Sequence, residues 1–229
     1  MDSRGLKYKR VTVFAGHYGS GKTNIAVNYA LALAEHGKVN IADIDIVNPY
    51  FRTKDAAEAL DKMGVRLISS SYANTNVDTP ALPADIYTVF EDRSTLAVAD
   101  VGGDDRGALA LGRYAEMMNS ENDFEMLFVF NKYRFLTSDA VGALEVMREI
   151  EAASGVEFTG IINNSNLGEE TDEDAVLASV DTAQELSRIS GLEIKMTTVK
   201  RELYEKLKDK IDNVQAIDLY VRQSWLRKE

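Results

Sequence analysis

The 229-residue chain has no cysteine, and it has little histidine. The lack of cysteine excludes disulfides, thiol catalysis and iron–sulfur clusters held by cysteine. Histidine occurs only at His17 and His36, which argues against a metal site built from histidines. We therefore expect any bound metal to be Mg²⁺ held by oxygen ligands.

Long hydrophobic runs and an excess of positive charge are also missing. No apolar stretch approaches the roughly eighteen residues of a membrane span, and the opening residues, MDSRGLKYKR, do not resemble a signal peptide. With 26 basic and 37 acidic residues, the net charge of −11 argues against binding to nucleic acid or to a membrane. No linker-like segment divides the chain, so we expect one cytoplasmic domain over residues 1–229.

The most specific motif reads GHYGSGKT and follows a short apolar run. It fills each fixed position of G-x-x-x-x-G-K-[ST], the phosphate-binding loop (P-loop) of nucleotide hydrolases. A helical pattern leaves the motif, as the strand–loop–helix unit requires. The nucleotide contacts predicted in and directly after the loop are Gly16, His17, Tyr18, Gly19, Ser20, Gly21, Lys22, Thr23 and Asn24.

Each type of residue in this loop has a physical reason to be there. Glycines can adopt backbone angles that let successive N–H groups converge on phosphate oxygens, at the positive end of the helix dipole. Lys22 is expected to bridge the β- and γ-phosphates, and the Thr23 hydroxyl to bind Mg²⁺. An ordinary glycine-rich turn before a helix is the alternative.

Acidic residues follow two of the predicted buried strands. Asp43 and Asp45 come at the end of the strand predicted over residues 38–44, and they point to the same side unless they are merely exposed acids at a turn. Asp100 and Gly103 form a D-x-x-G pattern at the end of the strand predicted over residues 95–100. In nucleotide hydrolases such a pattern supplies an acid for the Mg²⁺ shell and an N–H group that senses the γ-phosphate.

Two polar segments bear on which base would be bound. Asn131-Lys132-Tyr133-Arg134 begins like the guanine-reading motif N-K-x-D but has arginine in place of the acid, which removes the main support for GTP. Asn163 and Asn164 end the strand predicted over residues 156–163, where an amide matches the donor and acceptor edge of adenine. Turn formation is the alternative for these two asparagines.

Strand and helix patterns alternate along the whole chain. About seven strands are expected, over residues 11–14, 38–44, 65–69, 95–100, 124–130, 156–163 and 193–199. Two helices, over residues 201–208 and 212–227, are expected to close the chain. This alternation predicts an α/β fold with a mostly parallel sheet, helices on both faces and a ligand crevice at the carboxyl ends of the strands.

The segments GHYGSGKT, ADIDIVNP, VADVGGD and GIINNSN, in this order, resemble the MinD/ParA/CobQ-type P-loop ATPases of the SIMIBI class. The resemblance implies a three-layer P-loop fold, ATP or ADP with Mg²⁺ as ligands, and a homodimer that depends on nucleotide. It also implies that Asp45 orients the attacking water, that Asp43 and Asp100 support Mg²⁺, and that Asn164 contacts adenine.

His17 departs from this family. The family carries a lysine there that reaches the partner's phosphates in the dimer, and a neutral imidazole supplies less positive charge. An acid that raises the pKa of His17, or a substitute cation from Arg52 or Arg106, are the alternatives.

Three functions therefore stay open. The first is an Mg²⁺-dependent ATPase that acts as a switch on a protein partner. The second is an enzyme that uses ATP to activate a small molecule, with the segment over residues 70–85 holding the substrate. The third is a nucleotide-binding module with negligible hydrolysis.

Overall fold

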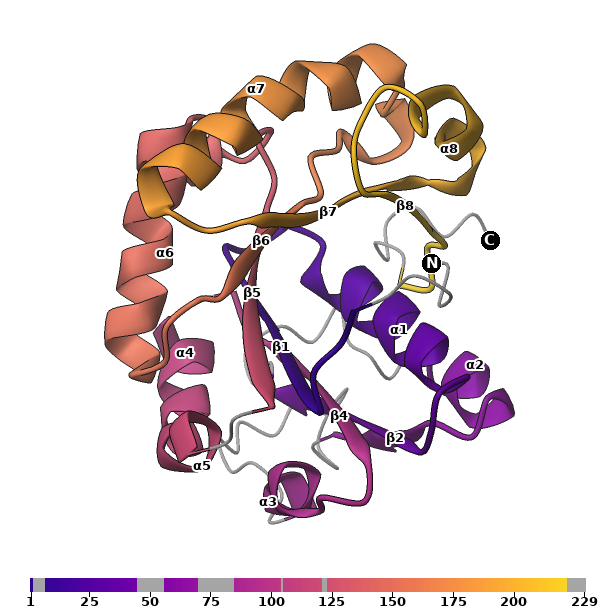
Figure 1. Cartoon of the computed structure of the whole chain (residues 1–229), viewed down its shortest axis with the longest axis vertical. Helices are drawn as coiled ribbons and strands as arrows, with labels where there is room; N and C mark the ends of the chain where they lie inside the picture. The colour runs from indigo at the N-terminus through magenta and orange to yellow at the C-terminus, as the bar shows by residue number, and fades with distance from the viewer. Residues whose placement is uncertain (2–6, 45–55, 70–84, 104, 121–122, 222–229) are drawn as a thin grey trace, which may run out of the picture.

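Eight parallel strands form one sheet in the computed structural model of the chain (Figure 1). The structure describes residues 1, 7–44, 56–69, 85–103, 105–120 and 123–221. The strands are β1 (Val11–Ala15), β2 (Val39–Ile44), β3 (Arg66–Ile68), β4 (Leu96–Val101), β5 (Phe124–Phe130), β6 (Gly160–Asn163), β7 (Ile194–Lys200) and β8 (Val214–Ile217). Their order across the sheet is β3-β2-β4-β1-β5-β6-β7-β8, and every neighbouring pair is parallel.

Helices cover both faces of this sheet (Figure 1). They are α1 (Lys22–Leu33), α2 (Ala57–Lys62), α3 (Asp85–Glu91), α4 (Asp105–Gly112), α5 (Ala115–Ser120), α6 (Ala140–Ser154), α7 (Glu173–Ser190) and α8 (Arg201–Leu207). Short 3₁₀ turns, η2 (Phe135–Thr137) and η3 (Gly168–Glu170), precede α6 and α7. The predicted α/β architecture is confirmed, with eight strands instead of about seven.

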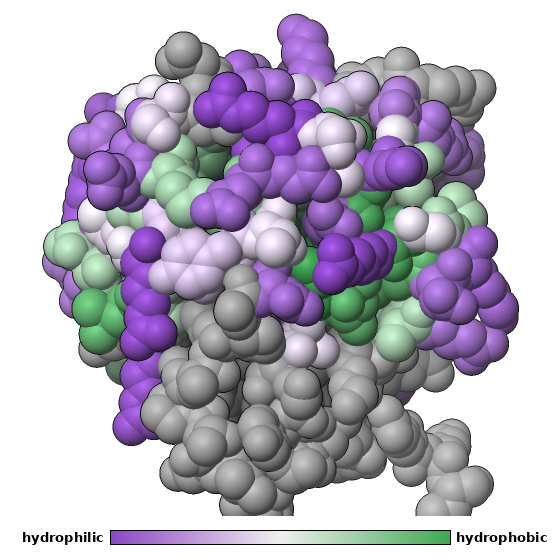
Figure 2. All heavy atoms as spheres, turned by 90° about the horizontal axis from the view of Figure 1, so that it is seen from below, coloured by the Kyte–Doolittle hydropathy of each residue, from purple (hydrophilic) through white to green (hydrophobic). Residues whose placement is uncertain are grey.

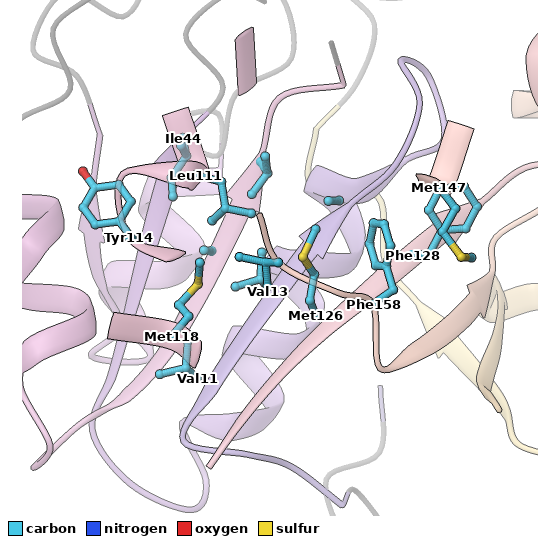
Figure 3. Close-up of a cluster of buried hydrophobic side chains, with 14 of the residues drawn as sticks. Val11, Val13, Ile44, Leu111, Tyr114, Met118, Met126, Phe128, Met147 and Phe158 are labelled. Carbon is cyan, nitrogen blue, oxygen red and sulfur yellow. The ribbon is translucent and has the colours of Figure 1, made fainter. Parts of the chain in front are cut away.

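Alternate residues of the central strands supply the two faces of the core, as the period of a strand requires. On β1, Val11 and Val13 lie in the cluster that α3 to α7 cover, whereas Phe14 packs with α1 and α2 on the other face. Figure 3 shows the first cluster, in which Met126 and Phe128 of β5 lie near Val13. Burial on both faces explains why these strands read as continuous apolar runs.

The C-terminal region differs from the prediction. The helix expected over residues 212–227 is not formed within the described part of that range, because Val214–Ile217 pairs with β7 as strand β8. Asn213, with a φ of 56°, turns the chain into this strand. The apolar spacing of Val214, Ile217 and Val221 fits a helix, but pairing with the neighbouring strand overrides that local preference.

The face of the molecule seen in Figure 2 is mainly hydrophilic and carries a smaller hydrophobic area. Among the described helices, none is long and apolar enough to cross a membrane. The sheet places the carboxyl end of β1 between those of β4 and β5, and this is the edge where open parallel sheets bind ligands.

Candidate functional site

The P-loop connects the carboxyl end of β1 with α1 and is built around three glycines with positive φ. Gly16, Gly19 and Gly21 have φ values of 154°, 76° and 90°, which side chains rarely tolerate. Gly16 also leaves no room for a side chain, because a Cβ atom there would lie 2.4 Å from the carbonyl oxygen of Val129. These positions show why glycine is needed at this bend.

No side chain of the described residues caps the N-terminus of α1. Gly21 is its N-cap residue and has no side chain to accept from the first-turn N–H groups. Lys22 is buried, and its Nζ donates to the carbonyl oxygen of His17 at 3.3 Å, while Ser20 N donates to the same oxygen at 3.1 Å. The loop thus curls around the lysine, which stands at the N-terminus of α1 where anions bind favourably.

Two buried carboxylates flank the loop on the β4 side. Asp43 of β2 pairs in register with Asp100 of β4, and Asp100 pairs with Phe14 of β1. Both acids share a sheet face with Ile41 and Val98, which pack with α1. Oxygen donors on the face that carries Thr23 fit Mg²⁺, which one or two carboxylates and substrate phosphates usually hold. The described residues form no cluster of three His, Cys, Asp or Glu side chains.

Gly103 lies directly against the P-loop. A Cβ atom at this position would be 2.6 Å from the backbone nitrogen of Tyr18 and 2.9 Å from Nζ of Lys22. The structure therefore brings the glycine of the D-x-x-G pattern to the lysine of the P-loop.

The surroundings of His17 disfavour a positive charge at the position where the family has its lysine. Burial lowers the pKa of His17, and the charges of Lys22 and Arg134 lower it further, against a raising effect from the backbone of Tyr18. The lowered pKa favours the neutral form of the imidazole. Glu149 is the described acid that raises this pKa, and its effect is the smallest of those on His17, so the alternative in which an acid keeps His17 charged stays a prediction. Arg106 is exposed at the start of α4.

On the β6 side, Asn164 braces the P-loop. Its Nδ2 donates to the carbonyl oxygen of Ser20 at 2.7 Å, and its Oδ1 accepts from the hydroxyl of Thr198 at 2.7 Å. Asn163 donates from Nδ2 to Oγ of Ser179 at 2.9 Å, and its Oδ1 accepts from the backbone of Ser165. Both asparagines are buried and hold the fold together here, so their predicted contact with a base stays a prediction.

Arg134 also contacts the P-loop, which sequence reasoning missed. Its Nε donates to the carbonyl oxygen of Gly19 at 2.9 Å. The arginine at the fourth position of N-K-x-R was the available signal, although we interpreted it only as a missing acid.

Asn24 uses its side chain for a different contact from the predicted one. Its Oδ1 accepts from the backbone N–H groups of Tyr220 and Val221, and its Nδ2 donates to the carbonyl oxygen of Val221. One turn later, Asn28 binds the backbone of Asp218 in both directions. These asparagines fasten residues 218–221 along α1, so any contact of Asn24 with nucleotide would use its backbone.

Several predicted features lie outside the described residues. They are Asp45, Arg52 and nearly all of the 70–85 segment. Their roles stay predictions.

The fold is similar to that of several solved structures. FtsY from Mycoplasma mycoides matches with a TM-score of 0.53 and 19% identity, over 95% of this chain and 66% of that one. Cell division protein ftsY from Thermotoga maritima matches with a TM-score of 0.55 and 18% identity, over 87% of this chain and 64% of that one. The Signal Recognition Particle 54 kDa protein from Aeropyrum pernix K1, in complex with GDP, matches with a TM-score of 0.55 and 16% identity. The match covers 85% of this chain and 42% of that one.

These likenesses concern the fold of the chain. At 19%, 18% and 16% identity they show the fold alone, so the SIMIBI class and the finer resemblance to MinD/ParA/CobQ ATPases stay predictions. The chain spans about two thirds of the length of the two ftsY structures and less than half of the third. No protein-family profile and no curated protein match the chain.

Proposed function

We propose that this protein is a cytoplasmic, Mg²⁺-dependent nucleoside triphosphate hydrolase that works slowly, as a switch on a protein partner. The nucleotide's phosphates bind the P-loop, and its terminal phosphate lies on the β4 side. The contact of Gly103 with Tyr18 and Lys22 carries this proposal, because a backbone N–H group beside the P-loop lysine can respond to the γ-phosphate.

The residues of the P-loop and of the β4 side have separate roles in this proposal. Lys22 and the first-turn N–H groups of α1 neutralise the phosphates, while Asp43, Asp100 and the Thr23 hydroxyl are the residues that would hold Mg²⁺. Bound Mg²⁺ would neutralise charge on the β- and γ-phosphates. Asp45 would orient the attacking water, as the resemblance to MinD/ParA/CobQ ATPases implies.

We propose ATP as the nucleotide. Guanine recognition needs a carboxylate that accepts from its N1–H and exocyclic amino groups, and Arg134 stands where that motif has its acid. GDP is bound in the Aeropyrum pernix structure, but at 16% identity that protein's base does not transfer to this chain.

A second candidate, a nucleotide-binding module with negligible hydrolysis, is favoured by the lowered pKa of His17. Without a cation at that position, a dimer lacks the lysine that the family uses in trans. The two candidates predict the same binding and different turnover.

Phosphate release and sedimentation with ATP and with ADP test this proposal. A switch releases phosphate slowly and changes its association between the two nucleotides. Asp45→Ala should bind ATP as the wild type does and lose turnover, whereas Asp61→Ala, on the exposed side of α2, should change neither. Bound ATP that is never hydrolysed would support the second candidate, and turnover only with an added small carboxylate or amine would indicate a synthetase.

A further inference from the structure

The P-loop lies between two groups of residues, one on the β4 side and one on the β5/β6 side. The proposed function assigns no contact with nucleotide to the residues of the β5/β6 side. On the β4 side lie Asp100 and Gly103, to which the proposed function assigns Mg²⁺ and the terminal phosphate. On the other side, β5 and β6 bring Arg134 and Asn164 to the loop. Because β1 lies between β4 and β5, a nucleotide with its terminal phosphate toward β4 extends its nucleoside toward β5 and β6.

Within the segment Asn131–Arg134, Arg134 is the residue whose side chain contacts the P-loop. Lys132 donates from Nζ to the carbonyl oxygen of Ala178, and the Tyr133 hydroxyl donates to that of Ala175, so both side chains are held on α7. Arg134 instead donates from Nε to Gly19 at 2.9 Å.

The guanidinium group is held in place before any ligand binds. A Cβ atom on Gly19 would lie 3.0 Å from Nε and 3.1 Å from Cζ of Arg134, so the guanidinium group packs closely against the glycine. The turn beneath it is closed by Arg134 N donating to Asn131 O at 3.1 Å and by Thr137 N donating to Arg134 O at 3.0 Å. Arg134 remains half-buried, so part of the group is accessible.

We infer that Arg134 is a specificity-determining residue that supports the purine base of the nucleotide through its guanidinium plane. A planar, weakly hydrated cation stacks well on an aromatic ring, and it reads the π-face of a base instead of its hydrogen-bonding edge. Such a platform favours purines over pyrimidines and does not need the guanine-reading acid. This inference rests on the proposed function, since it requires a nucleotide on the P-loop.

Binding of Mg-ATP and of inorganic tripolyphosphate, measured by calorimetry, separates a base contact from a phosphate contact. Arg134→Ala and Arg134→Gln should each weaken ATP binding about tenfold and change tripolyphosphate binding less than about twofold. Glutamine can keep the N–H donor to Gly19 but loses the cationic plane. Arg148→Ala, which removes an exposed ion pair with Glu151, is the control and should change neither.

The ratio of ATP to CTP affinity gives a second readout. It should exceed one in the wild type and approach one in Arg134→Ala. Equal weakening of ATP and tripolyphosphate, or an unchanged ATP to CTP ratio, would overturn the inference and leave Arg134 as a brace of the P-loop. Failure of the proposed function looks different, since wild-type protein would then bind neither ATP nor tripolyphosphate.

Discussion

The β4 side and the β5/β6 side of the P-loop use different chemistry. The β4 side presents two carboxylates, Asp43 and Asp100, and the backbone of Gly103. The opposite side presents the amide of Asn164 and the guanidinium of Arg134, both bound to P-loop carbonyl oxygens. One side is suited to a metal and a terminal phosphate, and the other supports the loop and the nucleoside. The loop itself serves both.

Removal of the lysine between the two sides should have the largest effect. We expect Lys22→Ala to weaken the binding of both ATP and tripolyphosphate by about a hundredfold or more, because a charge-assisted contact to phosphate is lost. Calorimetry measures this loss. Lys62→Ala, which removes an exposed ion pair with Glu58, is the control. Tight binding by the Lys22 variant would place the nucleotide elsewhere.

The next largest effect should come from the brace on the β6 side. Asn164→Ala leaves the Ser20 carbonyl and the Thr198 hydroxyl without this buried partner, which should lower the free energy of unfolding by about 2 kcal/mol. Urea denaturation measures it. Asn119→Ala removes a more exposed bond of 3.2 Å to the Gly155 carbonyl and should cost far less.

Ligand binding by the Asn164 variant sharpens the comparison with Arg134. If Asn164 only supports the P-loop, its loss affects the loop as a whole. Asn164→Ala should then weaken the binding of ATP and of tripolyphosphate by the same factor. Selective loss of ATP would instead give Asn164 the contact with adenine that the family resemblance implies.

A methyl group on the β4 side should have a smaller effect. Gly103→Ala places Cβ 2.6 Å from the backbone nitrogen of Tyr18, so the backbone must shift to relieve the overlap. This shift should weaken ATP binding about tenfold and ADP binding less. Gly37→Ala is the matched control, because its Cβ would meet Leu96 at an ordinary 3.9 Å. Equal weakening of ATP and ADP would argue against a γ-phosphate contact at Gly103.

The smallest effect is expected from a buried acid of β5 that neither side includes. Burial raises the pKa of Glu125 despite hydrogen bonds from Thr12 and Tyr29, at 3.1 and 3.2 Å to Oε1. The folded protein therefore holds this proton more tightly than the unfolded chain does. The resulting stability is present below the unfolded pKa and is lost as pH rises through the folded pKa.

Glu125→Gln should remove the loss of stability that the wild type shows as pH rises. We expect the variant to be about 1 kcal/mol more stable than the wild type at pH 8 and no more stable at pH 4, as measured by urea denaturation. Nucleotide affinity should not change. A wild-type advantage that grows with pH would contradict the raised pKa.

The sequence predicts the β4 side better than the β5/β6 side, for a physical reason. P-loop spacing and D-x-x-G are local patterns, and parallel strands bring their carboxyl ends to one edge, so the proximity of Gly103 to Lys22 follows from the motifs and the fold. The contact between Gly19 and Arg134 joins residues 115 positions apart, and no local pattern encodes it.

The C-terminal region was mispredicted for the same reason. The apolar spacing after residue 212 suits a helix, and only pairing with β7 makes Val214–Ile217 a strand. The bonds of Asn24 and Asn28 to residues 218–221 are likewise contacts between distant parts of the chain. Asparagines on a helix next to a P-loop favour a ligand role by position alone, which is why Asn24 was assigned to the nucleotide.

NMR of the wild-type protein tests the two-sided account most directly, by following the Gly103 amide and the Arg134 Nε–H while ligands are added. Tripolyphosphate with Mg²⁺ should shift the Gly103 signal and those of the P-loop amides and leave Arg134 nearly unchanged, whereas Mg-ATP should shift all of them. Equal shifts of Arg134 with both ligands, or no shift of Gly103 with either, would contradict the division of the P-loop into a phosphate side and a nucleoside side.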